Sequence, residues 1–192
     1  MIKKSLFLFN IFFIYLFFTS VSLADLQKKL INKLTATKTL SFDFKQKISN
    51  EEEIGNCFIK YPLLMRCNYQ NIKEKTIISN GKTVAIIKKK YKKIYYYPIK
   101  VTPFFFILKK EKIINLIRQN KPIEINSNLI GFEFIAQNTN KIKIFFDKNS
   151  LEFKGWKTKD SYSNDVSFTI NNLKTNSQIV DSFFKIPQEE DL

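Results

Sequence analysis

Two cysteines are the residues of this chain whose type and spacing suggest covalent chemistry. Cys57 and Cys67 stand on either side of Tyr61-Pro62, a dipeptide that favours a turn. They are separated by an even number of residues, so a β-hairpin would place both side chains on one face. Their spacing is not the Cys-x-x-Cys of redox enzymes. A structural disulfide is therefore the favoured interpretation, and two reduced, buried thiols are the alternative.

Other catalytic chemistry has little support in the sequence. The chain contains no histidine, which removes Ser-His-Asp systems, histidine acid/base catalysis and imidazole metal sites. Two cysteines cannot form a structural zinc site, and no glycine-rich phosphate loop is present. We predict a protein that is not an enzyme and that needs neither a metal nor a cofactor.

The first residues have the pattern of a secretory signal peptide. A basic start with Lys3 and Lys4 precedes an apolar run over 6–18, and Ser22-Leu23-Ala24 is a small-x-small cleavage site. A retained membrane anchor is the alternative, but the apolar run is short for a membrane span. We predict a signal peptide over 1–24 and a single mature domain over 25–192.

The chain is strongly basic, with 32 Lys+Arg against 17 Asp+Glu and a net charge of +15. An anionic partner such as a membrane surface or a lipid headgroup is one interpretation, and drift in the composition of an AT-rich genome is the other. Nucleic acid is not expected, because Arg66 and Arg118 are the only arginines and base recognition relies on arginine. The lysine-rich run over 88–93 is interpreted as a solvated turn between strands.

Hydrophobic periodicity predicts mostly short strands. Apolar residues have helical spacing over 25–34 and alternate with polar residues from Leu40 to Ile48. The acidic Glu51–Glu53 run is predicted as a turn, and Asn80-Gly81 is a strong hairpin signal. A helix or helix pair is expected over 103–119. Further strands are predicted over 76–78, 84–87, 94–99, 123–125, 129–136, 142–146, 151–157 and 166–170. The fold class is therefore mainly β (α+β): one antiparallel sheet of about ten to eleven strands, curled towards a barrel and covered by helices.

The order of these motifs resembles that of LolA, the family of periplasmic outer-membrane lipoprotein carriers. The resemblance covers nearly all of the mature chain. It is carried by short motifs in a fixed order: Phe44-Lys-Gln46, Lys60-Tyr61-Pro62, Ser79–Lys82, Thr102-Pro103-Phe104, Ile142–Trp156, Phe168-Thr-Ile170 and Phe184–Pro187.

The resemblance implies an unclosed β-barrel with a helical lid over an apolar cavity. It implies a monomer in the periplasm that takes acylated lipoproteins from an inner-membrane ABC transporter and passes them to an outer-membrane acceptor. Tyr61 stands where the family has an arginine that holds the lid by hydrogen bonds, and Cys67 stands where it has a cavity tryptophan. The candidate cargo or lid residues are Phe42, Phe44, Tyr61, Met65, Phe105, Phe106 and Ile107.

Two alternatives remain open from the sequence. The same fold could carry another amphiphile, such as lipopolysaccharide or a glycolipid, with lysines meeting its phosphates. It could also be a structural or sensor domain of the cell envelope without lipid cargo.

Overall fold

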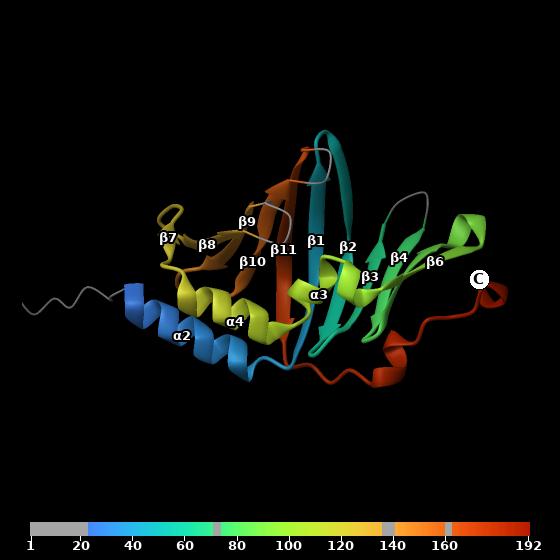
Figure 1. The fold of residues 1–192 in the computed structure, drawn as a ribbon, viewed down its shortest axis with the longest axis horizontal. Coiled ribbons are helices and arrows are strands. Elements are labelled where there is room, and N and C mark those ends of the chain that lie inside the picture. Colours follow the sequence, from blue (N-terminus) through green and yellow to red (C-terminus); the bar gives the residue numbers. More distant parts are fainter. Residues whose placement is uncertain (1–22, 71–73, 136–140, 160–162) are drawn as a thin grey trace, which may run out of the picture.

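The structure, a computed structural model, describes residues 23–70, 74–135, 141–159 and 163–192. The predicted signal peptide lies outside the described residues except for Leu23 and Ala24. One antiparallel sheet of 11 strands forms the body of the molecule (Figure 1). Its order is β6-β5-β4-β3-β2-β1-β11-β10-β9-β8-β7, so the sheet has two free edges and is not closed. The predicted mainly β fold with an unclosed sheet is confirmed.

The last strand of the chain lies beside the first, so β1 and β11 join the two halves of the sheet at its centre. The strand bounds are β1 Thr39–Ile48, β2 Glu51–Lys60, β3 Leu64–Tyr69, β4 Lys75–Asn80, β5 Thr83–Lys88, β6 Lys93–Pro98, β7 Ile123–Glu124, β8 Leu129–Ile135, β9 Lys141–Asp147, β10 Phe153–Lys159 and β11 Asp165–Thr175. The helices are α2 Leu23–Ala36, α3 Phe104–Ile107 and α4 Lys110–Gln119, and the short 3-10 turns are η2 Lys89–Tyr91, η3 Ile99–Val101, η4 Asp181–Phe184 and η5 Glu189–Asp191. Among the described residues, no helix is long and apolar enough to cross a membrane.

The acidic run predicted as a turn is part of a strand, and that prediction was wrong. Glu51–Glu53 opens β2, and the preceding turn contains Ser49, which has a φ of 52°. Lysines on β1, the adjacent strand, and on β4, two strands away, form ion pairs with the acidic side chains. Lys45 Nζ lies 2.9 Å from Glu52, and Lys75 Nζ lies 2.6 Å from Glu53. Cross-strand pairs of opposite charge stabilise a sheet, so an acidic run can form a strand here.

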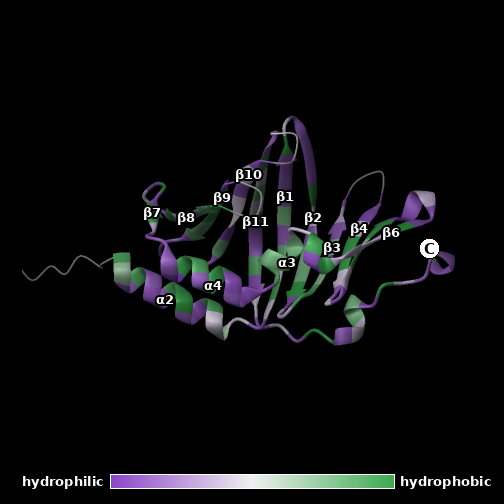
Figure 2. Ribbon diagram, in the orientation of Figure 1, coloured by the Kyte–Doolittle hydropathy of each residue, from purple (hydrophilic) through white to green (hydrophobic). Residues whose placement is uncertain are grey.

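The inner face of the sheet, defined as the face that carries the helices, is covered by α2 and α4 only over part of its width (Figure 1). The apolar sides of the two helices pack over β8 and β9, where Leu30 and Ile117 join Phe132 and Ile144 in one buried cluster (Figure 2). Burial of these side chains, not helix propensity, is what holds such short helices in place.

Part of the outer face, over β2–β6, is covered by the C-terminal strap, which we define as residues 176–192. The ring of Phe183 packs against Phe58 at 5.1 Å, and Lys60 Nζ lies 2.6 Å from Asp181. Farther along, Ile186 packs on a small buried cluster that includes Ile78. The strap therefore supports the half of the sheet whose inner face lacks the two long helices.

A row of aromatic rings crosses the inner face. Ring centroids are 4.9 Å apart for both Tyr69–Phe44 and Phe44–Phe168, and 3.9 Å apart for Phe168–Trp156. Gly55 leaves room for this row, because a Cβ there would lie 2.7 Å from the Phe44 ring and 2.2 Å from a main-chain oxygen. The row continues through Phe153 and Phe146.

We expect Gly55→Ala to destabilise the protein by about 1–3 kcal/mol, because the added methyl group overpacks the row and meets a main-chain oxygen. Gly131→Ala is the matched control. Its Cβ would approach the movable side chain of Ile125 at 3.0 Å and the main-chain oxygen of Ile144 at 3.3 Å, against 2.2 Å for the main-chain oxygen at Gly55, so the change should cost less than about 1 kcal/mol. Urea unfolding measures both. Equal stability of the two variants would contradict the close packing described for Phe44.

Candidate binding cavity

A cavity of about 770 Å³ lies between the inner face of the sheet and the helices. Ligand pockets in proteins typically span about 300–1,000 Å³. The cavity opens where α2 and α4 leave the inner face uncovered, and it extends to residues of both helices and of β9, such as Leu34, Leu116 and Ile144. The short helix α3 lies across it. Its sheet wall is mainly apolar and includes Leu40, Phe42, Ile59, Met65, Ile77, Ile144, Trp156 and Phe168.

Most of the residues predicted from the sequence lie on this cavity. Phe42, Tyr61 and Met65 line it from the sheet side, and Phe105, Phe106 and Ile107 line it from α3. Phe44 is different: it is 2% exposed, lies within the aromatic row and is not part of the lining. Phe44 lies two residues after Phe42 in the strand and therefore on the same inner face, but the neighbouring rings fill the space around it.

The sequence interpretation missed several lining residues. Trp156, the single tryptophan of the chain, lines the cavity while stacking on Phe168. Ile77 faces the cavity because it pairs directly with Cys67 across β3 and β4. The alternating pattern of each strand shows which residues share a face, but only the pairing of distant strands shows which face is the inner one.

Cys57 and Cys67 stand directly opposite each other in the β2–β3 ladder, and their sulfur atoms are bonded. They are 2% and 6% exposed and form part of the cavity wall. Both faces of the hairpin are therefore occupied: the inner one by the cysteines, the outer one by side chains that meet the C-terminal strap.

The lid is α3 together with Leu108, and its inner side chains are not densely packed. Phe104 to Ile107 are all half-buried, whereas Leu108 is fully buried. A backbone hydrogen bond joins the lid to the β2–β3 turn: the N–H of Leu63 donates to the Leu108 carbonyl at 3.2 Å. Phe106 also contacts Phe134 of β8 at 5.2 Å between ring centroids.

A second tether comes from Lys110 at the start of α4. Its Nζ donates to the carbonyl oxygens of Thr35 and Thr37 at 2.9 and 2.8 Å. These carbonyls lie at the C-terminal end of α2, where a positive charge is favourable. The lid is thus fixed between the sheet and the end of a helix.

Tyr61 does not make the hydrogen bond that the resemblance implies for its position. Within the described part of the chain, its hydroxyl has no hydrogen-bond partner, and its ring lies 5.6 Å from the Lys110 ammonium. Burial raises the pKa of the Tyr61 phenol well above its usual value, and the charge of Glu111 raises it further. The phenol is therefore neutral, and it contributes apolar surface and a ring face to the cavity.

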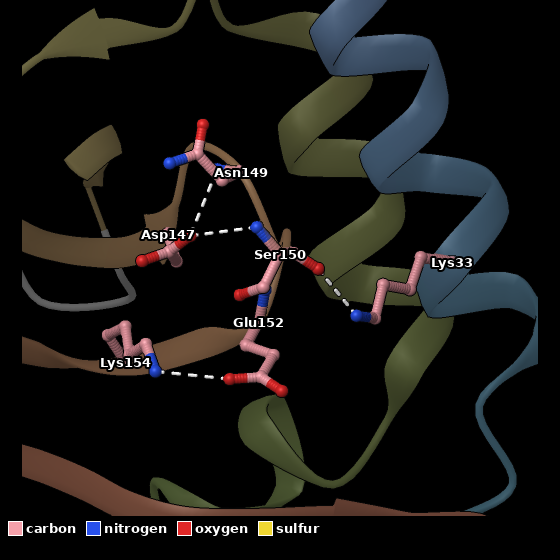
Figure 3. A network of polar contacts seen from close by, with 6 residues as sticks. All are labelled: Lys33, Asp147, Asn149, Ser150, Glu152 and Lys154. Carbon is pink, nitrogen blue, oxygen red and sulfur yellow. Dashed lines mark hydrogen bonds and ion pairs between the residues drawn. The ribbon is translucent and has the colours of Figure 1, made fainter. Parts of the chain in front are cut away.

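A polar network joins α2 to the β9–β10 turn (Figure 3). The Asp147 carboxylate accepts from the backbone N–H groups of Asn149 and Ser150 at 2.9 and 2.8 Å, and the Ser150 bond is the main cause that lowers the pKa of Asp147. Lys33 of α2 donates to the Ser150 carbonyl at 2.6 Å. The network fixes the end of α2 to the β9–β10 turn at the edge of the cavity.

The ionic residues of the lining are mostly positive. They are Lys33, Lys75, Lys100, Lys112, Lys159 and Glu152. An apolar wall with lysines among its lining residues can hold hydrocarbon inside and meet a negatively charged or polar headgroup at the opening.

A family model described as outer membrane lipoprotein carrier protein LolA matches residues 35–187. No curated protein matches the chain by sequence.

Several solved structures are similar in fold. An uncharacterized conserved protein from Thermus thermophilus is 8% identical with a TM-score of 0.53, over 85% of this chain and 94% of that chain. A chain of the MucA/MucB complex from Pseudomonas aeruginosa is 8% identical with a TM-score of 0.50, over 87% of this chain and 62% of that chain. A LolA superfamily protein from Nitrosomonas europaea is 7% identical with a TM-score of 0.47, over 87% of this chain and 99% of that chain. At these identities, the first two likenesses show a shared fold.

We expect Lys110→Met to loosen the lid, because it removes a charged donor from two helix-end carbonyls. The free energy of unfolding should fall by about 1–2 kcal/mol, and amide hydrogen exchange over 104–110 should accelerate more than exchange in β1. Lys109→Met is the matched control, since its ammonium lies over the Phe105 ring and not on helix-end carbonyls. Identical exchange in both variants would contradict the tether.

We expect the purified, denatured and unreduced protein to contain no titratable thiol, and two thiols after reduction. Closing a loop of this length stabilises a protein by roughly 2–3 kcal/mol, so reduction should lower the urea midpoint accordingly. Two reactive thiols before reduction would remove the cross-link from the description of the cavity wall.

Proposed function

Because the chain belongs to the outer-membrane lipoprotein carrier family LolA, we propose that it shields the acyl chains of a lipoprotein in the inner-face cavity. The single observation that supports this best is an apolar cavity of about 770 Å³ roofed by a half-buried aromatic lid. The proposal places the mature protein in the periplasm, as a monomer that carries one lipoprotein at a time.

The energetics of acyl chains explain why such a shield is needed. Each CH₂ group gains about 0.8 kcal/mol on leaving water. A long chain therefore cannot cross an aqueous compartment alone at a useful rate. The cavity wall offers Phe42, Met65 and Trp156 as apolar partners for that chain.

Release requires that the shield open, and the lid supports that step. Its phenylalanines are half-buried, so they can exchange contacts with each other for contacts with cargo at little net change in burial. Among the described residues, the main-chain tie between the lid and the β2–β3 turn is the single hydrogen bond from Leu63 to Leu108. In this proposal an inner-membrane ABC transporter loads the cavity and an outer-membrane acceptor empties it.

A second candidate keeps the cavity and changes the cargo. Lysines among the lining residues favour an amphiphile whose headgroup carries phosphate, such as a lipopolysaccharide or a glycolipid. A third possibility follows from the structure of the MucA/MucB complex, in which a protein of the same fold is assembled with a protein partner. Mass spectrometry of lipids that co-purify with the protein separates these cargo classes.

Trp156 provides a direct test of cargo entry, because it is the single tryptophan and lines the cavity. A triacylated lipopeptide with brominated acyl chains should quench its fluorescence in a soluble one-to-one complex, and the unbrominated lipopeptide should not. Bromine quenches only on close approach, so the signal reports acyl chains inside the cavity.

The matched control moves the tryptophan to the outer face. In the double variant Trp156→Phe with Phe145→Trp, the new indole lies on the opposite side of the sheet, since Phe145 alternates with the inward Ile144. The control should bind the lipopeptide without quenching. Equal quenching in both proteins, or no complex with either, would contradict the proposed shield.

A further inference from the structure

The free edge of the sheet at β6 gathers lysines and tyrosines that the cavity does not explain. Every charged residue from Lys75 to Lys110 is a lysine. The tyrosine side chains here are among the most exposed large apolar groups, with Tyr91 at 54% and Tyr96 at 55%. We call this surface the β6 edge patch, which consists of Lys88, Lys89, Lys90, Tyr91, Lys92, Lys93, Tyr95, Tyr96, Tyr97, Lys100 and Val101.

The patch is arranged at a cost to local stability. Lys88 and Lys93 stand directly opposite each other in the β5–β6 ladder, and like charges in that position destabilise a sheet. Lys92 has a φ of 48°, a left-handed conformation that glycine or asparagine adopts more easily. Stability alone would select other residues at these positions, so their clustering points to a role outside folding.

Protection of the free edge does not require these lysines. The N–H of Ile94 points away from β5 and is already capped by the Glu189 carboxylate of the strap at 2.8 Å. Pro98, which shares that outward orientation four residues later, has no N–H to offer. Two other devices therefore already block an incoming strand, although edge lysines often serve that purpose.

Within the described chain, the lysines of the patch have no direct ion-pair partners, although the strap brings the Glu189 carboxylate to the same edge. Among residues 23–70, 74–135, 141–159 and 163–192, none of its lysines makes an ion pair within 4.0 Å. Elsewhere, lysines such as Lys60 and Lys75 are paired at 2.6 Å. Lys88 instead lies over the ring of Tyr95 at 5.2 Å. The patch therefore presents ammonium groups and aromatic rings together to the solvent.

We propose that the β6 edge patch binds the surface of a bilayer that contains anionic phospholipids. Lysines attract the negative lipid headgroups, and tyrosines settle at the boundary between headgroups and acyl chains because they combine an apolar ring with a polar tip. The chemistry of both residue types matches this occupant better than a small anion, which would leave the exposed tyrosine rings without a partner.

The patch also leads into the cavity mouth. Lys100 and Val101 belong to both the patch and the cavity lining, and Val101 is 75% exposed just before the lid. Docking at β6 would therefore bring the lid close to the membrane. The delivery of cargo at the membrane rests on the proposed function, whereas binding of the patch to vesicles does not. Vesicle binding and the carrier function can therefore be refuted separately.

The test uses the full mature chain and large unilamellar vesicles in a co-sedimentation assay without any lipopeptide. We expect binding to vesicles of phosphatidylcholine and phosphatidylglycerol at about 3:1, and little binding to phosphatidylcholine alone. Each lysine near an anionic surface contributes roughly a five-fold factor. The triple variant Lys89→Gln, Lys90→Gln and Lys92→Gln should therefore bind on the order of a hundred-fold more weakly.

The matched control removes the same charge elsewhere, by changing the exposed Lys38, Lys47 and Lys174 to glutamine. It should retain most of the binding, with thermal unfolding confirming that both variants fold. Tyr96→Ser should weaken the binding that persists at high salt, where charge attraction is screened. The proposal is overturned if the natural protein ignores anionic vesicles, or if both triple variants lose binding equally. Binding to vesicles without cargo quenching of Trp156 would instead contradict the carrier proposal alone.

Discussion

A single sheet this wide has more apolar inner surface than its helices can cover, and the rest of the structure depends on that mismatch. The two long helices bury the inner face over β8 and β9, where Ile130 and Phe132 are fully buried. Over the β1–β5 half, the described chain has no helix of comparable length, and the surface there remains as a wall. The C-terminal strap supports that wall from behind, and on its inner side the lid residues Phe104, Phe105 and Leu108 pack against the wall.

The aromatic row lies across the inner face in the middle of the sheet. Its rings stack edge to face or in parallel from Tyr69 to Trp156, arrangements that favour aromatic pairs beyond their burial. Because Gly55 has no side chain, the Phe44 ring can lie close to β2, and Gly155 lets β10 approach the main chain of β11. Apart from Phe44, the rings of the row also line the cavity, so the row forms part of the cavity floor.

Much of this architecture could be predicted from the sequence, because it follows from local patterns. The alternation of Phe42 and Phe44 located the first strand, and Asn80-Gly81 located a hairpin turn whose glycine has a φ of 92°. The part that could not be predicted depends on distant neighbours. Phe42 faces the cavity and Phe44 does not, although both share one face and one residue type. The difference comes from Tyr69 and Phe168, which both pack on the Phe44 ring at 4.9 Å and lie farther along the chain.

The acidic run illustrates the same limit of prediction. Glu52 and Glu53 form ion pairs with lysines on β1 and β4, and the local sequence does not reveal these partners. The hydrogen-bonded contacts of the lid region had no signal in the sequence. One joins main-chain groups of Leu63 and Leu108, and the other joins the Lys110 ammonium to carbonyls at the end of α2. Main-chain donors and acceptors are the same for nearly every residue type, and no pattern of side chains announces them.

That property of the lid has an evolutionary consequence. A closure made by a peptide N–H and a peptide carbonyl survives substitution of almost any residue that keeps the local backbone. The side chains of α3 are consequently free to diverge in size and shape without loss of the closed state. Selection can then change the side chains that roof the cavity to suit different cargoes while the main-chain hydrogen bond that closes the lid stays the same. A change of cargo therefore does not require a new lid contact.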